Sequence, residues 1–138
     1  FAVDDNRGLC MDGWHVPSYE EFMELEMELG MSEEEANSEG SRGTDEGSKL
    51  AGNSDLWNDG NLENNSEFGT SGFNGLPAGY RGSYLGTYYG MGSSGYFWSS
   101  SESSSNYAWY RGLYYGSPDV LRDYANWLVG FSIRCLKD

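Results

Sequence analysis

The strongest constraint on the fold is the order of local patterns, because helix signals come early in the chain and strand signals come late. Ser18 and Glu21 form a capping-box pair, followed by apolar residues at helical spacing and a terminating glycine. Ser32 and Glu35 repeat the capping box, so we expect two short N-terminal helices. Beyond Phe73, short strand-like runs are separated by Gly/Ser turns. The sequence therefore predicts an α+β fold.

The predicted strands span residues 95–100, 108–115, 120–125 and 129–136. Residues 41–72 show little periodicity and are rich in Gly, Asn, Ser and Asp, so we expect a long loop region there. The length of 138 residues fits a single domain, 1–138. No apolar stretch approaches the roughly 18 residues that a membrane span requires, so we expect no membrane insertion by this segment.

Charge and aromatic content divide the chain. The first 67 residues hold 18 acidic and 3 basic residues, whereas residues 68–138 carry a net charge of +1. The total of −14 argues against a nucleic-acid partner, because phosphate binding needs a basic surface. Of the 22 aromatic residues, 17 lie at or beyond Phe68, and 10 of these are Tyr. Tyr beside Ser, Gly and Asn is typical of a contact surface, and a Tyr-rich β core explains the same composition, so both interpretations stay open.

The two cysteines, Cys10 and Cys135, lie near opposite ends of the chain. A disulfide between them would stabilise the fold by roughly 5 kcal/mol through loop closure and would indicate an oxidising compartment. Two buried thiols in a reduced cytosol are the alternative. The chain starts at Phe1 without Met, so we expect any export signal or lipid anchor to have preceded it.

Five motifs occur in order along the chain: GWHVPS (13–18), RGTDEGSKL (42–50), GFNGLPAGYR (72–81), YFWSS (96–100) and GFSIRC (130–135). Together they resemble the Fibrobacter succinogenes major paralogous domain family, and the match covers nearly the whole chain. The resemblance implies a C-type-lectin-like fold, which is shared with formylglycine-generating enzymes and occurs in exported bacterial and some phage-encoded proteins. It also implies that the terminal strands pair, as part of an antiparallel arrangement, and bring Cys10 and Cys135 together. We therefore expect an extracellular location, on a cell surface or a phage particle.

The resemblance further suggests a candidate binding face. Some domains of this fold are targets of diversity-generating retroelements, which replace residues at adenine-rich codons near the C-terminus. The candidate ligand-binding residues lie between family-like positions and are Tyr107, Trp109, Tyr114, Tyr115, Leu121, Asp123, Tyr124, Asn126 and Trp127. A weakly constrained, solvent-facing strand ladder is the alternative. Successive strand residues point to opposite faces, so Trp109 and Tyr115 are expected to point away from Tyr114, and part of this set could belong to the core.

Catalysis is not expected. His15 is the single histidine, and it lies in what resembles a structural entry to the first helix. Formylglycine-generating relatives use a cysteine pair within the site, whereas the two cysteines here are assigned to the terminal disulfide. Paired carboxylates can catalyse glycoside hydrolysis, but the carboxylates here cluster on the predicted helices, where we expect a solvated acidic face.

An acidic loop offers a candidate calcium site. Its oxygen donors are Asn53, Asp55, Asn58, Asp59, Asn61 and Glu63. Their spacing is not that of an EF-hand, and Asx turns explain the same residues without a metal. Calcium is therefore a candidate cofactor, and no other cofactor is indicated.

Two classes of function remain open. A surface-displayed recognition or adhesion module would use the Tyr/Trp-rich face to bind a protein or glycan on another cell or surface. A structural subunit would use the same aromatic residues to assemble with copies of itself. A formylglycine-generating-like enzyme is a distant third. Exposure of the face in the monomer would favour recognition, whereas burial between copies would favour assembly.

Overall fold

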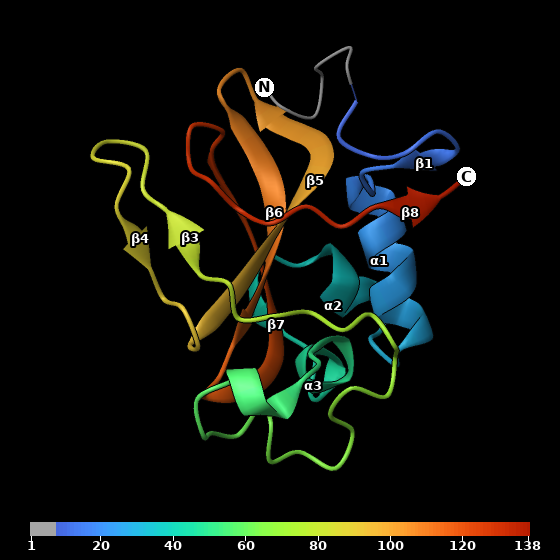
Figure 1. Cartoon of the computed structure of the whole chain (residues 1–138). Helices are drawn as coiled ribbons and strands as arrows, with labels where there is room; N and C mark the ends of the chain where they lie inside the picture. Colours follow the sequence, from blue (N-terminus) through green and yellow to red (C-terminus); the bar gives the residue numbers. More distant parts are fainter. Residues whose placement is uncertain (1–7) are drawn as a thin grey trace.

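The computed structural model describes residues 8–138 and places an antiparallel sheet at the centre of the molecule (Figure 1). Its four strands lie in the order β2-β7-β6-β5, and two short pairs, β1-β8 and β3-β4, lie beside it. The strands are β1 (Trp14–His15), β2 (Gly40–Arg42), β3 (Tyr80–Arg81), β4 (Tyr88–Tyr89), β5 (Ser94–Ser104), β6 (Tyr107–Tyr114), β7 (Ser117–Asn126) and β8 (Leu136–Lys137). With the short helices described next, this is the α+β class that the sequence predicted.

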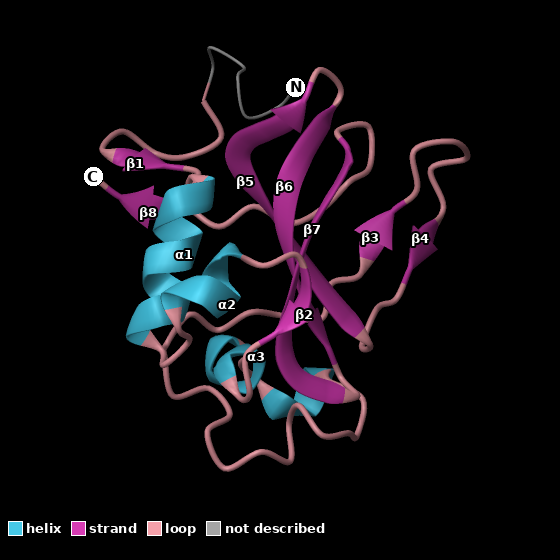
Figure 2. Ribbon diagram, turned by 180° about the vertical axis from the view of Figure 1, so that it is seen from behind, coloured by secondary structure: helices cyan, strands magenta, loops and turns pink. Residues whose placement is uncertain are grey.

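Helices α1 (Tyr19–Glu28) and α2 (Glu33–Asn37) both begin at a capping box. At the start of α1, Ser18 Oγ accepts from the Glu21 N–H, and the Glu21 carboxylate accepts from the Ser18 N–H at 2.8 Å. These bonds satisfy backbone donors that the first turn leaves free. Figure 2 shows both helices on one side of the sheet and the β3–β4 hairpin on the other. No helix within residues 8–138 is long and apolar enough to cross a membrane.

The loop prediction for residues 41–72 is wrong in part. Strand β2 extends into this region, and helix α3 (Glu46–Leu50) and a 3₁₀ turn, η1 (Ser54–Leu56), follow it. A helix this short contains too few turns to give a periodic pattern, so the sequence did not reveal α3. Its close packing depends on Gly47, because a Cβ at this position would collide with the carbonyl of Asp119 in β7.

The strand predicted at 129–136 is also wrong over most of its length. Its last residue belongs to β8, and isolated backbone bridges at Gly130 and Ser132 are the remaining strand-like contacts. Between these bridges Phe131 stacks on Tyr96, with ring centroids 4.9 Å apart. The segment crosses the sheet to bury this ring, and it does not continue the ladder (Figure 1).

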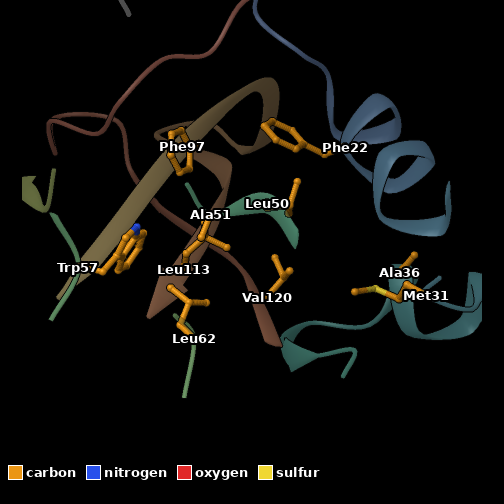
Figure 3. Close-up of a cluster of buried hydrophobic side chains, with 10 residues drawn as sticks. All are labelled: Phe22, Met31, Ala36, Leu50, Ala51, Trp57, Leu62, Phe97, Leu113 and Val120. Atoms are coloured by element: carbon orange, nitrogen blue, oxygen red, sulfur yellow. The ribbon is translucent and has the colours of Figure 1, made fainter. Parts of the chain in front are cut away.

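The hydrophobic core lies between the sheet, the helices and the long loop. Its buried side chains are Phe22, Met31, Ala36, Leu50, Ala51, Trp57, Leu62, Phe97, Leu113 and Val120 (Figure 3). Trp57 and Leu62 come from the region that follows α3, and the Trp57 indole N–H donates to the Gly52 carbonyl. The loop therefore contributes to the core and is not a separate flap.

Glu26 of α1 is completely buried beside this core. Its carboxylate accepts from Arg111 Nε at 2.6 Å and from Arg42 Nη2 at 2.7 Å, and both arginines are buried. Arg122 lies nearby and donates to the Tyr19 hydroxyl at 2.6 Å. The interpretation of the helix carboxylates as a solvated face is therefore wrong for Glu26. One carboxylate and three guanidinium groups form an ionic cluster inside the fold.

The two ends of the described chain are joined covalently and by strand pairing. β1 and β8 pair antiparallel, and the disulfide Cys10–Cys135 lies next to this pair. The resemblance implied both features, and the structure confirms them. His15 adds a third connection, because Nδ1 lies 2.6 Å from Asp138 Oδ1 and Nε2 lies 2.9 Å from Glu21 Oε1. Both ring nitrogens can donate only when the imidazole is protonated.

The His15 connection predicts a pH-dependent stability. The hydrogen bond to Asp138, and secondly that to Glu21, raises the pKa of His15 above its ordinary value of 6.5. A raised folded-state pKa contributes stability that is complete below the unfolded pKa and is lost as the pH rises through the folded pKa. The Tm of His15→Gln should therefore fall further below that of the wild type at about pH 6 than at about pH 9. Equal differences at the two pH values would contradict this.

Candidate functional site

The outer face is the side of the four-stranded sheet that points away from Phe22 and Glu26 of α1. Backbone register places one residue from each strand in a single row across it: Ser41 (β2), Leu121 (β7), Gly112 (β6) and Tyr96 (β5). Directly paired residues of antiparallel strands point to the same face. Gly112 has no side chain, so the row contains a gap, which opens into a shallow cavity of about 230 Å³.

The cavity has aromatic, aliphatic and polar walls. Tyr96, Tyr114 and Leu121 line it together with the polar residues Ser41, Ser117 and Asp119. Tyr114 is about half exposed, and its ring meets Tyr115 edge-on at 4.7 Å. The cavity therefore combines flat ring surfaces with hydroxyl and carboxylate oxygens.

A second carboxylate lies on the same face. Asp119, Leu121 and Asp123 alternate along β7, so all three point outward. Asp123 is paired with Tyr110, and the burial of Tyr110, followed by the negative charge of Asp123, raises the pKa of Tyr110 to about 12. The outer face thus carries acidic groups on either side of Leu121.

The segment that leads to β8 covers one half of the outer face. Phe131 packs on Trp98 at 4.5 Å and on Tyr110 at 4.8 Å between ring centroids. Both Trp98 and Tyr110 are consequently buried. The half that contains the Gly112 cavity remains open.

The β3–β4 hairpin projects from the body of the molecule (Figures 1 and 2). Its large exposed side chains are Tyr84, Leu85, Tyr88 and Tyr89, and Met91, which follows the hairpin, is exposed as well. The exposed fraction is 93% for Tyr84 and 78% for Met91. Tyr80 anchors the hairpin, because its ring stacks on Tyr89 at 5.3 Å and meets Tyr96 edge-on at 5.7 Å. Ring contacts thus connect the hairpin to a wall of the cavity.

The sequence interpretation missed the hairpin as a candidate surface. The available signal is the run from Gly82 to Ser101, which contains no charged residue although the chain carries a net charge of −14. Clustered exposed apolar side chains on a soluble domain often mark an interaction site. The uncharged run therefore includes the hairpin from Gly82 onward, and it continues into β5, where Phe97 and Trp98 are buried.

The nine predicted contact residues do not lie on one surface. Tyr114, Leu121 and Asp123 belong to the outer face. Tyr115 is half-buried and packs against the hydrophobic core, on the other side from Tyr114. Trp127 is half-buried in the turn after β7, where its backbone N–H donates to the Asn106 carbonyl.

The other four predicted residues lie on the helix-facing side of the sheet, where β6 begins and β7 ends. They are Tyr107, Trp109, Tyr124 and Asn126. Tyr124 meets Tyr107 at 6.0 Å and Trp109 at 5.4 Å, in both cases edge-on. The Arg122 guanidinium lies 4.7 Å from the Trp109 ring centroid, which ties Trp109 to the buried ionic cluster. Asn126 Oδ1 accepts a backbone N–H in the following turn. Alternation along the strands separates these residues from Tyr114.

Three of the six candidate calcium ligands take part in side-chain hydrogen bonds within the protein. The Asn58 and Asn61 amides donate to Ser93 Oγ and to the Gly116 carbonyl, and Asp59 accepts from Asn64. The other three candidates are Asn53, Asp55 and Glu63. Across residues 8–138, no three His, Cys, Asp or Glu side chains gather as a metal site. These contacts favour the turn interpretation, and calcium binding stays a prediction.

The comparisons with known proteins agree with the resemblance seen in the motifs. The family model described as the Fibrobacter succinogenes major domain matches residues 1–137. No curated protein and no solved structure matches the chain. Because the match spans almost the whole sequence, the chain belongs to the Fibrobacter succinogenes major domain family.

Proposed function

We propose that this domain is a recognition module of C-type-lectin-like fold, displayed outside the cytoplasm, that binds a protein or glycan through its outer face and the β3–β4 hairpin. We assign it no catalytic role. The observation that carries the proposal is the continuity of exposed rings with a cavity, from the hairpin through Tyr80 and Tyr96 to Gly112.

The chemistry of these side chains suits molecular recognition. Tyr offers a large contact area and a hydrogen-bonding hydroxyl at a low cost in side-chain entropy, which is why binding surfaces are rich in it. Tyr84 and Tyr88 make this area available on the hairpin, and Tyr114 makes it available at the cavity. Gly112 lines the cavity between these rings without a side chain of its own.

The scaffold behind this surface supports the proposal. On the other side of the sheet, Glu26 joins α1 to β6 and β2, and the disulfide closes the ends of the chain beside β1 and β8. Outward-facing residues such as Leu121 and Asp123 can therefore change without altering the core, as diversification by a retroelement would require. A disulfide also agrees with an oxidising location.

Self-assembly is the second candidate, and the exposure of Leu85 and Met91 on the projecting hairpin favours it. Aliphatic side chains of this kind are buried when copies of a chain associate. Sedimentation velocity separates the two functions. A monomer at the concentrations used for binding supports recognition, whereas an oligomer that dissociates in Leu85→Ser supports assembly.

The proposed function is tested on an array of defined glycans and peptides. Tyr88→Ala should weaken binding to the retained probes by about 1–3 kcal/mol, or roughly 5- to 150-fold in Kd. Tyr107→Ala is the matched control, because it makes the same change on the helix-facing side and should leave Kd unchanged. Probes that bind Tyr88→Ala as well as the wild type, but not Tyr107→Ala, would contradict the proposal.

A further inference from the structure

The shape of the cavity on the outer face depends on the glycine at position 112. A Cβ placed on Gly112 would lie 3.2 Å from a Leu121 methyl and 3.3 Å from the Tyr96 ring. The floor of the cavity is therefore backbone, enclosed by Tyr96, Leu121 and Tyr114. Its volume of about 230 Å³ lies below the roughly 300–1,000 Å³ of pockets that hold whole small molecules. The cavity is sized for one side chain or one small group.

The charges around this cavity have one sign. Asp119 lines it, Asp123 lies on the same face beyond Leu121, and no Lys or Arg is among the lining residues. The nearest arginines in the strand register, Arg111 and Arg122, point to the helix-facing side, where Glu26 binds Arg111. The net charge of −14 adds a long-range field of the same sign. An anionic group would be repelled at this position.

The aromatic walls add a specific attraction for a cation. The faces of Tyr rings carry negative electrostatic potential, and an ammonium or guanidinium group within about 6 Å of a ring centroid is stabilised by it. Tyr96 and Tyr114 lie on different sides of the Gly112 floor, on β5 and at the end of β6. A long aliphatic side chain with a cationic end would contact Leu121 through its methylene groups and the rings and Asp119 through its charge.

We propose that the Gly112 cavity binds a Lys or Arg side chain of a protein partner. This inference rests on the proposed function, because it names the chemistry of the ligand at that same surface. It favours a basic protein segment over a glycan as the partner.

The test is an NMR titration of the ¹⁵N-labelled domain with Nα-acetyl-lysine-N-methylamide and with a pentalysine peptide. Amide signals of Gly112, Leu121 and Tyr114 should shift, with pentalysine binding the more tightly of the two. Affinity should fall at about 0.5 M salt, because exposed charges are screened. Methyl glucoside and Nα-acetyl-glutamate-N-methylamide are the neutral and anionic comparisons, and neither should shift these signals.

Asp119→Asn removes the lining charge with little change in shape and should weaken pentalysine binding about threefold or more. Asp12→Asn is its control, since it makes the same change at an exposed position that does not line the cavity. Equal effects of the two variants would show that overall charge alone attracts the peptide, and would overturn the site. Gly112→Ala, which fills the floor, should also weaken binding, provided that its amide spectrum remains that of a folded domain.

The outcomes separate this inference from the proposed function. Shifts of the lining residues with methyl glucoside, and not with the lysine probes, would overturn the cationic ligand while supporting the outer face as a binding surface. No shift with pentalysine up to the millimolar range would also overturn the cationic ligand. The array experiment would then still test whether the outer face and the hairpin bind a ligand. Shifts confined to Tyr107 and Tyr124 would contradict both.

Discussion

Glu26→Gln is expected to lower the free energy of unfolding by about 3–5 kcal/mol, the cost of removing one partner from a buried ion pair. Glu26 is completely buried and bonds Arg111 and Arg42, which are also buried. The substitution nearly preserves volume, so the loss comes from leaving the guanidinium charges without a counter-ion. Urea unfolding monitored by Trp fluorescence measures it.

Three nitrogen atoms of the clustered arginines already lack a hydrogen-bond partner within the described part of the chain. Among the buried side chains of residues 8–138, Arg42 Nε, Arg111 Nη1 and Arg122 Nε have no hydrogen-bond partner. Glu24→Gln is the matched control, because it makes the same change at an exposed position of α1 and should alter stability by less than about 0.5 kcal/mol. Similar losses in Glu24→Gln and Glu26→Gln would contradict the role of the cluster.

Removal of the disulfide is expected to cost about 2–5 kcal/mol. The bond joins residues 125 positions apart, so it restricts most of the unfolded chain. Cys10→Ser/Cys135→Ser should unfold at lower urea concentration than the oxidised wild type. Addition of a reductant should destabilise the wild type by a similar amount and leave the double variant unchanged. A reductant that leaves the unfolding midpoint of the wild type unchanged would contradict this prediction.

Local signals predicted the regular parts of the fold well. The capping boxes at Ser18 and Ser32 mark the starts of α1 and α2, and the runs near 95–100, 108–115 and 120–125 became β5, β6 and β7. Side-chain caps and two-residue alternation act over a few residues, so a single sequence contains them.

Contacts between distant segments were not predictable in the same way. Glu26 lies four residues after Phe22, on the apolar stripe of α1, which was a sign that it faces the core. Its partners, however, lie 16 and 85 residues away, and no local pattern names them. The split of the predicted contact residues has a similar cause. The alternation of strand residues predicts that Trp109 and Tyr114 point to opposite faces of the sheet. Which parts of each face are buried depends on Phe22, which packs in the core, and on Phe131, which packs on the outer face.

The proposed function requires a ligand to contact the outer face and the hairpin. Hydroxyl-radical footprinting with mass spectrometry, done with and without the tightest-binding probe from the array, measures this contact. We expect reduced oxidation of Tyr84, Tyr88 and Tyr114 in the complex, with Tyr107 and Tyr124 unchanged, although all five rings are exposed in the free domain. Protection of Tyr107 and Tyr124 with continued oxidation of the other three would contradict it.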